Sequence, residues 1–128
     1  MIVPEDLRYT AEHEWVRPLA DGGTVRVGIT DYAQDALGDV VYVDLPTVGD
    51  AVEANASVGE VESTKSVSEM YAPVSGTIAA VNEALADNPQ LLNEDPYGEG
   101  WLCEIAVTDV ASIGAMMDAV AYVALTEG

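Results

Sequence analysis

The fold of this chain is decided by the stretch Gly59-Glu60-Val61-Glu62-Ser63-Thr64-Lys65-Ser66-Val67-Ser68-Glu69-Met70-Tyr71. A short polar centre at residues 63–66 is flanked by two arms, and in each arm polar and apolar side chains alternate. Such a pattern is typical of a β-hairpin, because successive side chains of a strand point to opposite faces. It predicts that Lys65 lies at or near the tip of the hairpin.

Period-two alternation continues on both sides of this hairpin. Val25, Val27 and Ile29 fall on one predicted face, and positions 101 to 107 repeat the pattern. Val41, Val43 and Leu45 are expected to share another face. Turn signals rich in Gly, Pro and Asp separate the runs. Short strands with frequent turns predict a mostly β chain, folded as a barrel or a sandwich.

Helices are expected to be few and short. The clearest covers residues 31–37, where Thr30 is a suitable N-cap and Gly38 suits the left-handed position after the last turn. Ala36, with Ala33 and Leu37, is expected to face the core.

Two further helical segments are predicted. Asn88-Pro89 opens a helical turn that would end near Asn93, because proline is well tolerated at the first helical position. The tail from Ser112 to Leu125 is rich in Ala and Met, and it predicts an amphipathic terminal helix. Its buried face would hold Met116, Val120, Tyr122 and Val123.

The charge balance restricts the partners that this chain can bind. Four basic residues against 23 acidic ones give 128 residues a net charge of -19. Nucleic acids and anionic membrane surfaces would be repelled, whereas basic protein surfaces would be attracted. No apolar run approaches membrane-spanning length, and the start lacks the features of a signal peptide. We expect a bacterial cytoplasmic protein, or a mitochondrial one only if a presequence has been removed.

Cysteine usage argues against an intramolecular disulfide and against a cysteine-based metal site. The single cysteine, Cys103, cannot form an intramolecular disulfide, and its place in an alternating run predicts a small buried side chain. No metal-binding pair of the Cys-x-x-Cys kind occurs, so no metal site is expected. Trp15 and Trp101 are expected to be core aromatics.

Lys65 is the only lysine of the chain. As an exposed ammonium among carboxylates, it would by itself be a solvated surface charge. A Schiff-base or general-base lysine would need a lowered pKa, yet the neighbouring Glu60, Glu62 and Glu69 favour the charged form. An amide made by a separate ligase removes this difficulty, so Lys65 is a candidate for covalent modification and the chain is not expected to be an enzyme.

The surroundings of Lys65 resemble the core of lipoyl and biotinyl carrier domains. Gly49-Asp50, Val61-Glu62-Ser63-Thr64-Lys65 and Ala72-Pro73-Val74-Ser75-Gly76 carry this resemblance. Biotinyl domains typically have Met on both sides of the lysine, and here Thr64 and Ser66 stand there, so lipoate is favoured over biotin.

The resemblance extends from Leu7 to about Trp101, where the chain is similar to the glycine cleavage H-protein family. Several blocks match in order and spacing: His13-Glu14-Trp15-Val16, Val27-Gly28-Ile29-Thr30-Asp31-Tyr32-Ala33-Gln34, Leu37-Gly38-Asp39, Pro89-Gln90-Leu91-Leu92-Asn93 and Pro96-Tyr97-Gly98-Glu99-Gly100-Trp101. The resemblance implies one lipoyl-carrier domain over 1–128, with a lipoyl core at about 49–82 and a helical tail at about 111–126. The implied fold is a mostly β barrel-sandwich hybrid with short helices, the lysine on a β-hairpin and a C-terminal helix.

The same resemblance implies a carrier role that depends on lipoic acid attached covalently to Lys65. The carrier would take an aminomethyl group from a pyridoxal-phosphate glycine decarboxylase to a folate-dependent aminomethyltransferase. Its dihydrolipoyl arm would then be reoxidised by a dihydrolipoamide dehydrogenase, and a lipoyl transferase or ligase would attach the group. A carrier that relays lipoyl groups to other proteins, a biotinyl carrier and an unmodified acidic interaction domain stay open as alternatives.

Two residues near the N-terminus are further candidates. By resemblance, Glu14 belongs to a segment that lines a cleft for the loaded arm, where its carboxylate would bind the aminomethyl ammonium. The alternative is that Glu14 only holds a strand edge or caps a turn. His13 is expected to be a hydrogen-bonded structural residue rather than a proton shuttle.

Overall fold

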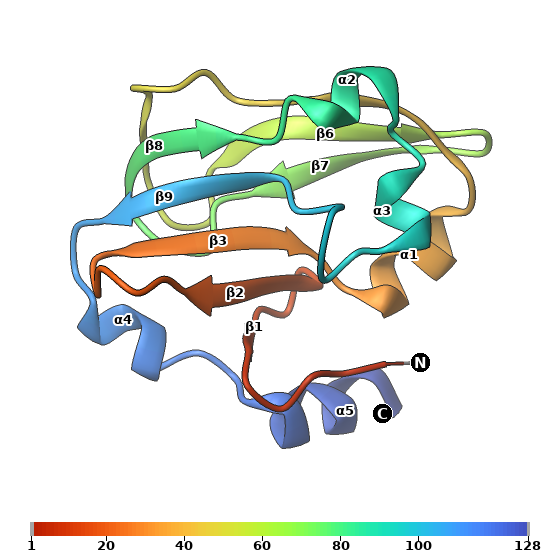
Figure 1. Cartoon of the computed structure of the whole chain (residues 1–128). Helices are drawn as coiled ribbons and strands as arrows, with labels where there is room; N and C mark the ends of the chain where they lie inside the picture. Colours follow the sequence, from red (N-terminus) through yellow and green to blue (C-terminus); the bar gives the residue numbers. More distant parts are fainter. Residues whose placement is uncertain (1, 128) are drawn as a thin grey trace.

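The computed structural model describes residues 2–127 as two antiparallel sheets with short helices at their margins (Figure 1). The larger sheet has six strands in the order β1-β2-β3-β9-β8-β5, and the smaller has three in the order β4-β6-β7. The prediction of a mostly β chain with short helices is confirmed. Within residues 2–127 the sheets do not close into a barrel, so the sandwich is the observed arrangement.

The strands are short, as the turn signals predicted. The larger sheet is formed by β1 (Arg8–Tyr9), β2 (Glu14–Pro18), β3 (Thr24–Ile29), β9 (Cys103–Val107), β8 (Gly76–Val81) and β5 (Ala51–Val52). The smaller is formed by β4 (Val40–Asp44), β6 (Ser57–Ser63) and β7 (Val67–Tyr71). The two-residue strands β1 and β5 end the larger sheet, which leaves little free edge for pairing with another chain.

Buried apolar side chains fill the space inside the sandwich. Val25, Val27 and Ile29 are all buried, which confirms the predicted face of β3. Cys103 and Ile105 of the neighbouring strand β9 are also buried, and Cys103 is a free thiol as expected. Burial of these side chains is the main favourable term that holds the sheets together.

A β-bulge changes the predicted face of β4. Between Val40 and Tyr42 the register shifts by one residue against β6, so two residues of β4 oppose one of the partner strand. Val40 and Val43 are therefore buried, whereas Val41 is exposed. The expectation that Val41 and Val43 share a face is wrong, because the extra residue of the bulge interrupts the alternation of side chains between the two faces of the strand.

Three short helices gather at the end of the sandwich that carries the hairpin tip (Figure 1). The predicted helix α1 (Asp31–Leu37) is confirmed, with the Thr30 hydroxyl accepting the Ala33 N–H and Gly38 at a φ of 81°. Ala36 is exposed rather than core-facing. Helix α3 (Leu91–Glu94) follows Pro89 as expected, while α2 (Ala84–Asp87) was not predicted.

The C-terminal tail is two helices rather than one. Helix α4 (Ala111–Gly114) and helix α5 (Ala119–Glu127) are separated where Met117 pairs with Tyr9 through two backbone hydrogen bonds of 2.9 and 3.2 Å. Pairing with the edge of β1 takes the backbone out of the helical conformation. Within α5, Tyr122 is buried, whereas the predicted core residue Val120 is 79% exposed.

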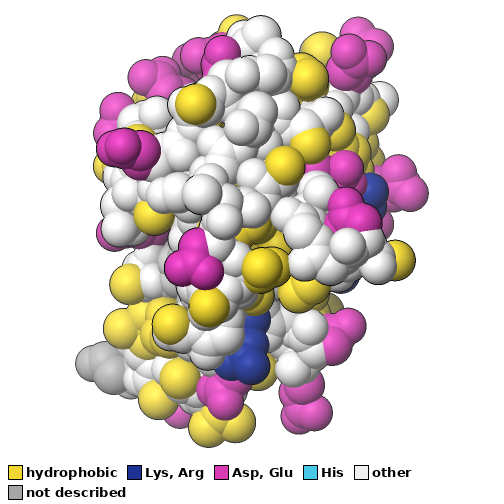
Figure 2. All heavy atoms as spheres, turned by 90° about the vertical axis from the view of Figure 1, so that its left-hand side faces the viewer, with side chains coloured by type: hydrophobic (Ala, Val, Ile, Leu, Met, Phe, Trp, Pro, Cys, Tyr) yellow, Lys and Arg dark blue, Asp and Glu magenta, His cyan; other side chains and the backbone are white. Residues whose placement is uncertain are grey.

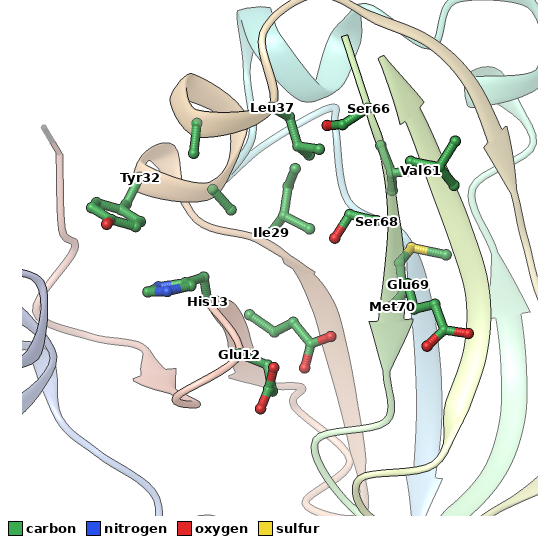
Figure 3. A pocket seen from close by; sticks show the side chains of 14 residues that line it. Glu12, His13, Ile29, Tyr32, Leu37, Val61, Ser66, Ser68, Glu69 and Met70 are labelled. Atoms are coloured by element: carbon green, nitrogen blue, oxygen red, sulfur yellow. The ribbon is translucent and has the colours of Figure 1, made fainter.

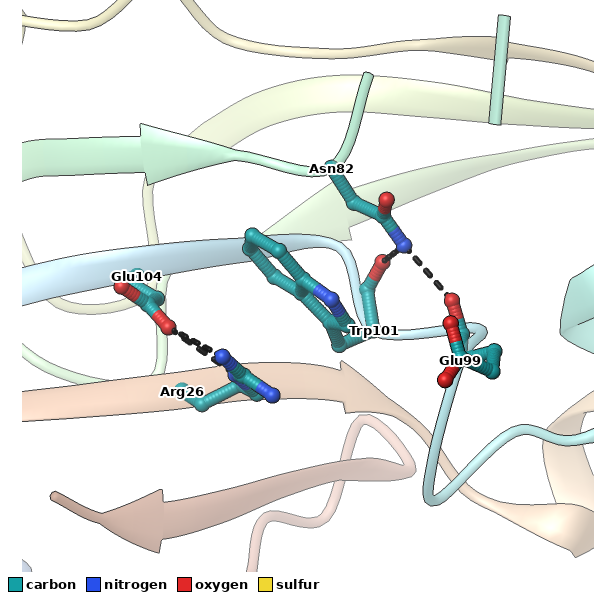
Figure 4. A network of polar contacts seen from close by, with 5 residues as sticks. All are labelled: Arg26, Asn82, Glu99, Trp101 and Glu104. Carbon is teal, nitrogen blue, oxygen red and sulfur yellow. Dashed lines mark hydrogen bonds and ion pairs between the residues drawn. The ribbon is translucent and has the colours of Figure 1, made fainter. Parts of the chain in front are cut away.

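The two tryptophans have different environments. Trp15 is fully buried, and its indole N–H donates to the Pro96 carbonyl at 2.9 Å. Trp101 is only partly buried and packs against the core cluster that contains Trp15, so it lies at the edge of the core. The Arg26 guanidinium lies 4.5 Å from its ring centre and pairs with Glu104 at 2.8 Å (Figure 4). Asn82 holds the backbone beside Trp101 through bonds to the Glu99 and Trp101 carbonyls.

Residues 2–127 contain no helix of the length and apolarity that crossing a bilayer requires. Nor do these residues bring together three or more His, Cys, Asp or Glu side chains in an arrangement that suits a metal ion.

The close approach of Trp15 to Gly28 makes a test of the packing. A Cβ at position 28 would lie 2.5 Å from carbons of the Trp15 indole ring. We expect Gly28→Ala to lower the free energy of unfolding by about 2 kcal/mol or more, in the range of overpacked cores. Gly23→Ala is the matched control, since nothing lies within 4 Å of a Cβ there. Urea unfolding measures both, and equal midpoints for the two variants would contradict the packing.

Candidate functional site

Lys65 is exposed at the tip of the hairpin that joins β6 to β7, as the sequence predicted. Ser63 shapes the tip. Its hydroxyl accepts the backbone N–H groups of Lys65 and Ser66 at 3.3 and 3.1 Å, and its own N–H donates to the Ser66 carbonyl at 2.8 Å. The tip is therefore a tight turn held by a serine side chain, and it presents the lysine to solvent.

A cleft of about 340 Å³ opens beside this hairpin (Figure 3). One wall comes from α1 and carries Tyr32 and Leu37, and the opposite wall comes from β7 and carries Ser68. The segment 12–14 closes the cleft between them. The lining is mixed: Ile29, Val61 and Met70 are apolar, while Glu12, Glu14 and Glu69 are acidic. Such a lining suits an aliphatic chain with a cationic end.

Glu14 is the buried carboxyl of this cleft, with 3% of its surface exposed. Its Oε2 accepts the Tyr71 N–H at 2.7 Å, and its Oε1 accepts the Thr10 hydroxyl at 3.4 Å. Burial raises the pKa of Glu14 to about 8, helped by the charge of Glu12 and opposed by the two hydrogen bonds. Burial therefore holds Glu14 largely neutral at pH 7, and a cation beside it would favour the ionised form.

His13 is fixed by its neighbours rather than free to move. Its backbone φ is 67°, and its Nδ1 lies 2.8 Å from the Tyr122 hydroxyl, which is also 2.7 Å from the Thr30 hydroxyl. Its ring centre is 4.6 Å from that of Tyr32. Burial lowers the pKa of His13, partly offset by Glu12. A neutral ring bonded to Tyr122 of the terminal helix agrees with the structural role predicted for His13.

The chain is strongly acidic overall, and its three arginines are engaged in other contacts. Figure 2, which shows the side of the molecule turned away from the hairpin tip, has Asp and Glu side chains spread over it and few basic atoms among them. Arg26 pairs with Glu104, Arg17 lies 5.0 Å from the ring centre of Trp15, and Arg8 donates to the Met116 carbonyl. Among residues 2–127, Arg26–Glu104 is the one ion pair within 4 Å. Docking surfaces of basic partners would face little positive charge.

Comparison with known proteins decides the family. The sequence model described as Glycine cleavage H-protein matches residues 7–128. The chain belongs to the glycine cleavage H-protein family. Within this family, it is 61% identical to the glycine cleavage system H protein of Micrococcus luteus over 124 residues, which cover 97% of each chain. It is 60% identical to that of Corynebacterium jeikeium over 127 residues, which cover 98% of each chain.

A solved structure of the H-protein family agrees with the fold. The crystal structure of a glycine cleavage system H protein from Mycobacterium marinum has a TM-score of 0.89 and 46% sequence identity. The match covers 98% of this chain and 100% of that one. The resemblance inferred from the quoted blocks is therefore confirmed, and the chain is a component of the same kind of system.

The structure brings the two predicted site residues to one region, because the hairpin with Lys65 and the segment with Glu14 both border the cleft. Sequence reasoning missed the cleft walls contributed by Tyr32 and Ser68, which lie on separate elements. It also missed Asn93 of α3, whose side chain bonds the Gly38 carbonyl and the Val40 N–H and which the sequence identified only as the end of a helical turn. None of Tyr32, Ser68 and Asn93 has a local sequence signal, because these residues come together only when α1 and α3 pack against the hairpin.

The raised pKa of Glu14 predicts a pH-dependent stability. Its ordinary value is 4.5 and its folded value is about 8, so the folded chain holds the proton more tightly than the unfolded one. This contribution is complete below about pH 4.5 and is lost as the pH rises through about 8. Relative to Glu14→Gln, the wild-type protein should lose about 2 kcal/mol or more between pH 5.5 and 8.5. Urea unfolding at both pH values measures it, and parallel losses in the two proteins would contradict a buried, neutral Glu14.

Proposed function

We propose that this protein is the lipoyl carrier of a glycine cleavage system, with lipoic acid attached through an amide to Nζ of Lys65. The observation that carries the proposal is a sole lysine exposed at a hairpin tip beside a cleft. Membership of the H-protein family and the names of the Micrococcus and Corynebacterium relatives support it. The chain itself would not be an enzyme but a carrier subunit, and its bacterial relatives agree with a place in the bacterial cytoplasm.

The residues beside Lys65 fit a lipoyl arm. Ile29, Val61 and Met70 offer apolar contacts to an aliphatic chain, and Glu14 offers a carboxyl to a cation at its end. When attached, the lipoyl dithiolane would accept an aminomethyl group and later be left as a dithiol. This chain supplies the tether, the walls that exclude water and the carboxyl that binds the ammonium.

Partners follow from the proposed chemistry and from the charge. They are a pyridoxal-phosphate glycine decarboxylase, a folate-dependent aminomethyltransferase and a dihydrolipoamide dehydrogenase, together with the lipoyl transferase or ligase. A tether raises the local concentration of the cofactor at each enzyme, so weak docking is sufficient. A net charge of -19 favours basic docking surfaces and fast, salt-sensitive association.

A relay of lipoyl groups to other proteins would use the same lysine, and an unmodified interaction domain would not need it. A biotinyl carrier would also use a hairpin lysine, although Thr64 and Ser66 flank it here instead of Met. Intact mass distinguishes lipoate from biotin on Lys65, and a transfer assay to an unmodified acceptor domain identifies a relay.

Lys65→Arg tests the attachment site. Arginine keeps the positive charge and an exposed tip tolerates it, but a ligase does not acylate a guanidinium as it does an amine. After expression with lipoate and its ligase, we expect a mass increase for the wild-type chain and none for Lys65→Arg, with equal unfolding midpoints. Lipoate on the variant, or none on the wild-type protein, would exclude Lys65 as the attachment site.

Glu14→Gln tests the cleft. A charge-assisted hydrogen bond to an ammonium is worth about 1.5 to 3 kcal/mol. Because the pKa of Glu14 is about 8, the docked arm should be favoured by about tenfold or more at pH 8.5, where the carboxylate is already ionised, and by less at pH 7. In the isolated, loaded carrier, the variant should lose the aminomethyl group to water faster, with the unloaded carrier lipoylated and folded normally. Unchanged loss would assign Glu14 to structure alone.

The acidic surface predicts a salt dependence of docking. The KM of the glycine decarboxylase for this carrier should rise severalfold between 20 mM and 200 mM salt, because screening weakens attraction between opposite charges. A neutral co-solute at matched osmolarity controls for effects unrelated to charge. A flat KM would mean that charge does not steer the encounter.

A further inference from the structure

The hairpin tip is tied to the loop that follows helix α1. The Thr64 N–H donates to the Asp39 carbonyl at 3.0 Å, next to the pairing of Val40 with Ser63. The ladder between β4 and β6 thus continues to the residue before Lys65. The position of the lysine backbone therefore depends on the backbone of segment 38–40.

Asn93 of helix α3 fixes this segment from the other side. Its Nδ2 donates to the Gly38 carbonyl at 2.8 Å and to the Gln34 Oε1 at 3.1 Å, and its Oδ1 accepts the Val40 N–H at 2.9 Å. One side chain thereby bonds the backbone on both sides of Asp39. The Asp39 carbonyl in turn accepts the Thr64 N–H. Two consecutive sets of hydrogen bonds therefore join Asn93 to the hairpin tip.

Gly38 lies beside the lysine side chain. A Cβ at this position would lie 3.3 Å from Cε of Lys65, 3.8 Å from Cδ and 4.0 Å from Nζ. The lysine stem therefore lies across a residue without a side chain. Any larger residue at 38 would move the flexible stem and would also be strained at a φ of 81°.

We propose that Asn93 and Gly38 are positioning residues for the modification of Lys65. Asn93 holds segment 38–40 and, through Asp39, the hairpin tip. Gly38 has no side chain, so the aliphatic part of the Lys65 side chain can lie over its backbone. This inference rests on the proposed function, because the modification is acylation by a lipoate ligase.

The step that depends on this positioning is an acyl transfer. The neutral Nζ attacks the carbonyl carbon of a lipoyl adenylate bound to the ligase. A carbon–nitrogen bond forms, the bond from that carbon to the phosphate oxygen breaks, and AMP leaves with the electron pair while the amine gives up a proton. A preoriented amine raises the rate of such a transfer, since fewer orientations must be searched in the bound complex.

Two variants and two matched controls test the proposal. Asn93→Ala removes the bonds to segment 38–40, and Asn82→Ala removes a similar set of backbone bonds away from the tip. Gly38→Ala places a Cβ beside Lys65. Gly22→Ala imposes comparable strain, at a φ of 76°, with nothing within 4 Å. Urea midpoints are measured for all four, so that stability is compared directly.

Kinetics of acylation by purified lipoate ligase, with lipoate and ATP, provide the first readout. We expect Asn93→Ala and Gly38→Ala to lower kcat about tenfold with little change of KM, because the acidic docking surface is unaltered. The control variants should keep the wild-type kcat even where they lose as much stability. The proposal would be overturned if Asn93→Ala and Gly38→Ala kept the kcat of the wild-type protein, or if the control variants lost as much kcat as they do.

The sole lysine gives a second readout that needs no modification. In protein labelled with ¹³C at the lysine ε-carbon, Lys65 gives one resonance, which should show a nuclear Overhauser contact to the Gly38 α-protons. Hydrogen exchange at the Thr64 amide should be about tenfold faster in Asn93→Ala and unchanged in Asn82→Ala. Absence of the contact in the wild-type protein would overturn the positioning, even with normal acylation. A wild-type protein that shows the contact but is never acylated would instead contradict the proposed function.

Discussion

The hydrogen bond from the Tyr71 N–H to the Glu14 carboxyl is the contact on which the site depends. Glu14 belongs to β2 of the larger sheet and Tyr71 to β7 of the smaller, so the bond joins the two layers where both border the cleft. A buried carboxyl is costly without partners, and this one is satisfied by a backbone N–H and by Thr10. The same burial that makes the bond necessary raises the pKa of the carboxyl to about 8.

A second set of contacts joins the ends of the chain to the cleft. Tyr122 of α5 bonds both His13 and the N-cap residue Thr30, and its ring stacks on Tyr9 at 4.7 Å. The terminal helix therefore supports the start of α1 and the segment 12–14 together. Loss of the tail would expose the large buried rings of Tyr9 and Trp15.

The sequence predicted the parts of this molecule that depend on neighbours in the chain. The hairpin with Lys65 follows from alternation around a polar centre, and α1 follows from Thr30 and Gly38 at its ends. The bulge at Val41 and the break at Met117 were not predictable, because each depends on a partner strand distant in the sequence. Position 38 shows both cases: its positive φ was anticipated, whereas its contact with Lys65 depends on how α1 packs against the hairpin.

The exposure of the tip means that the local charge at Lys65 is open to any protein that approaches it. An ammonium carries a positive charge and an amide carries none, so acylation of Lys65 would take the net charge from -19 to -20, which is -19 minus the one charge lost. The change is small relative to the total net charge, but it removes the positive charge at the tip. Lys65 is the only lysine or arginine between positions 27 and 128. On the proposed function, the attaching enzyme would meet a cation at the tip before acylation and a neutral amide after it, on a chain that is otherwise strongly acidic. Electrostatics could thus separate substrate from product for the attaching enzyme without any change of fold.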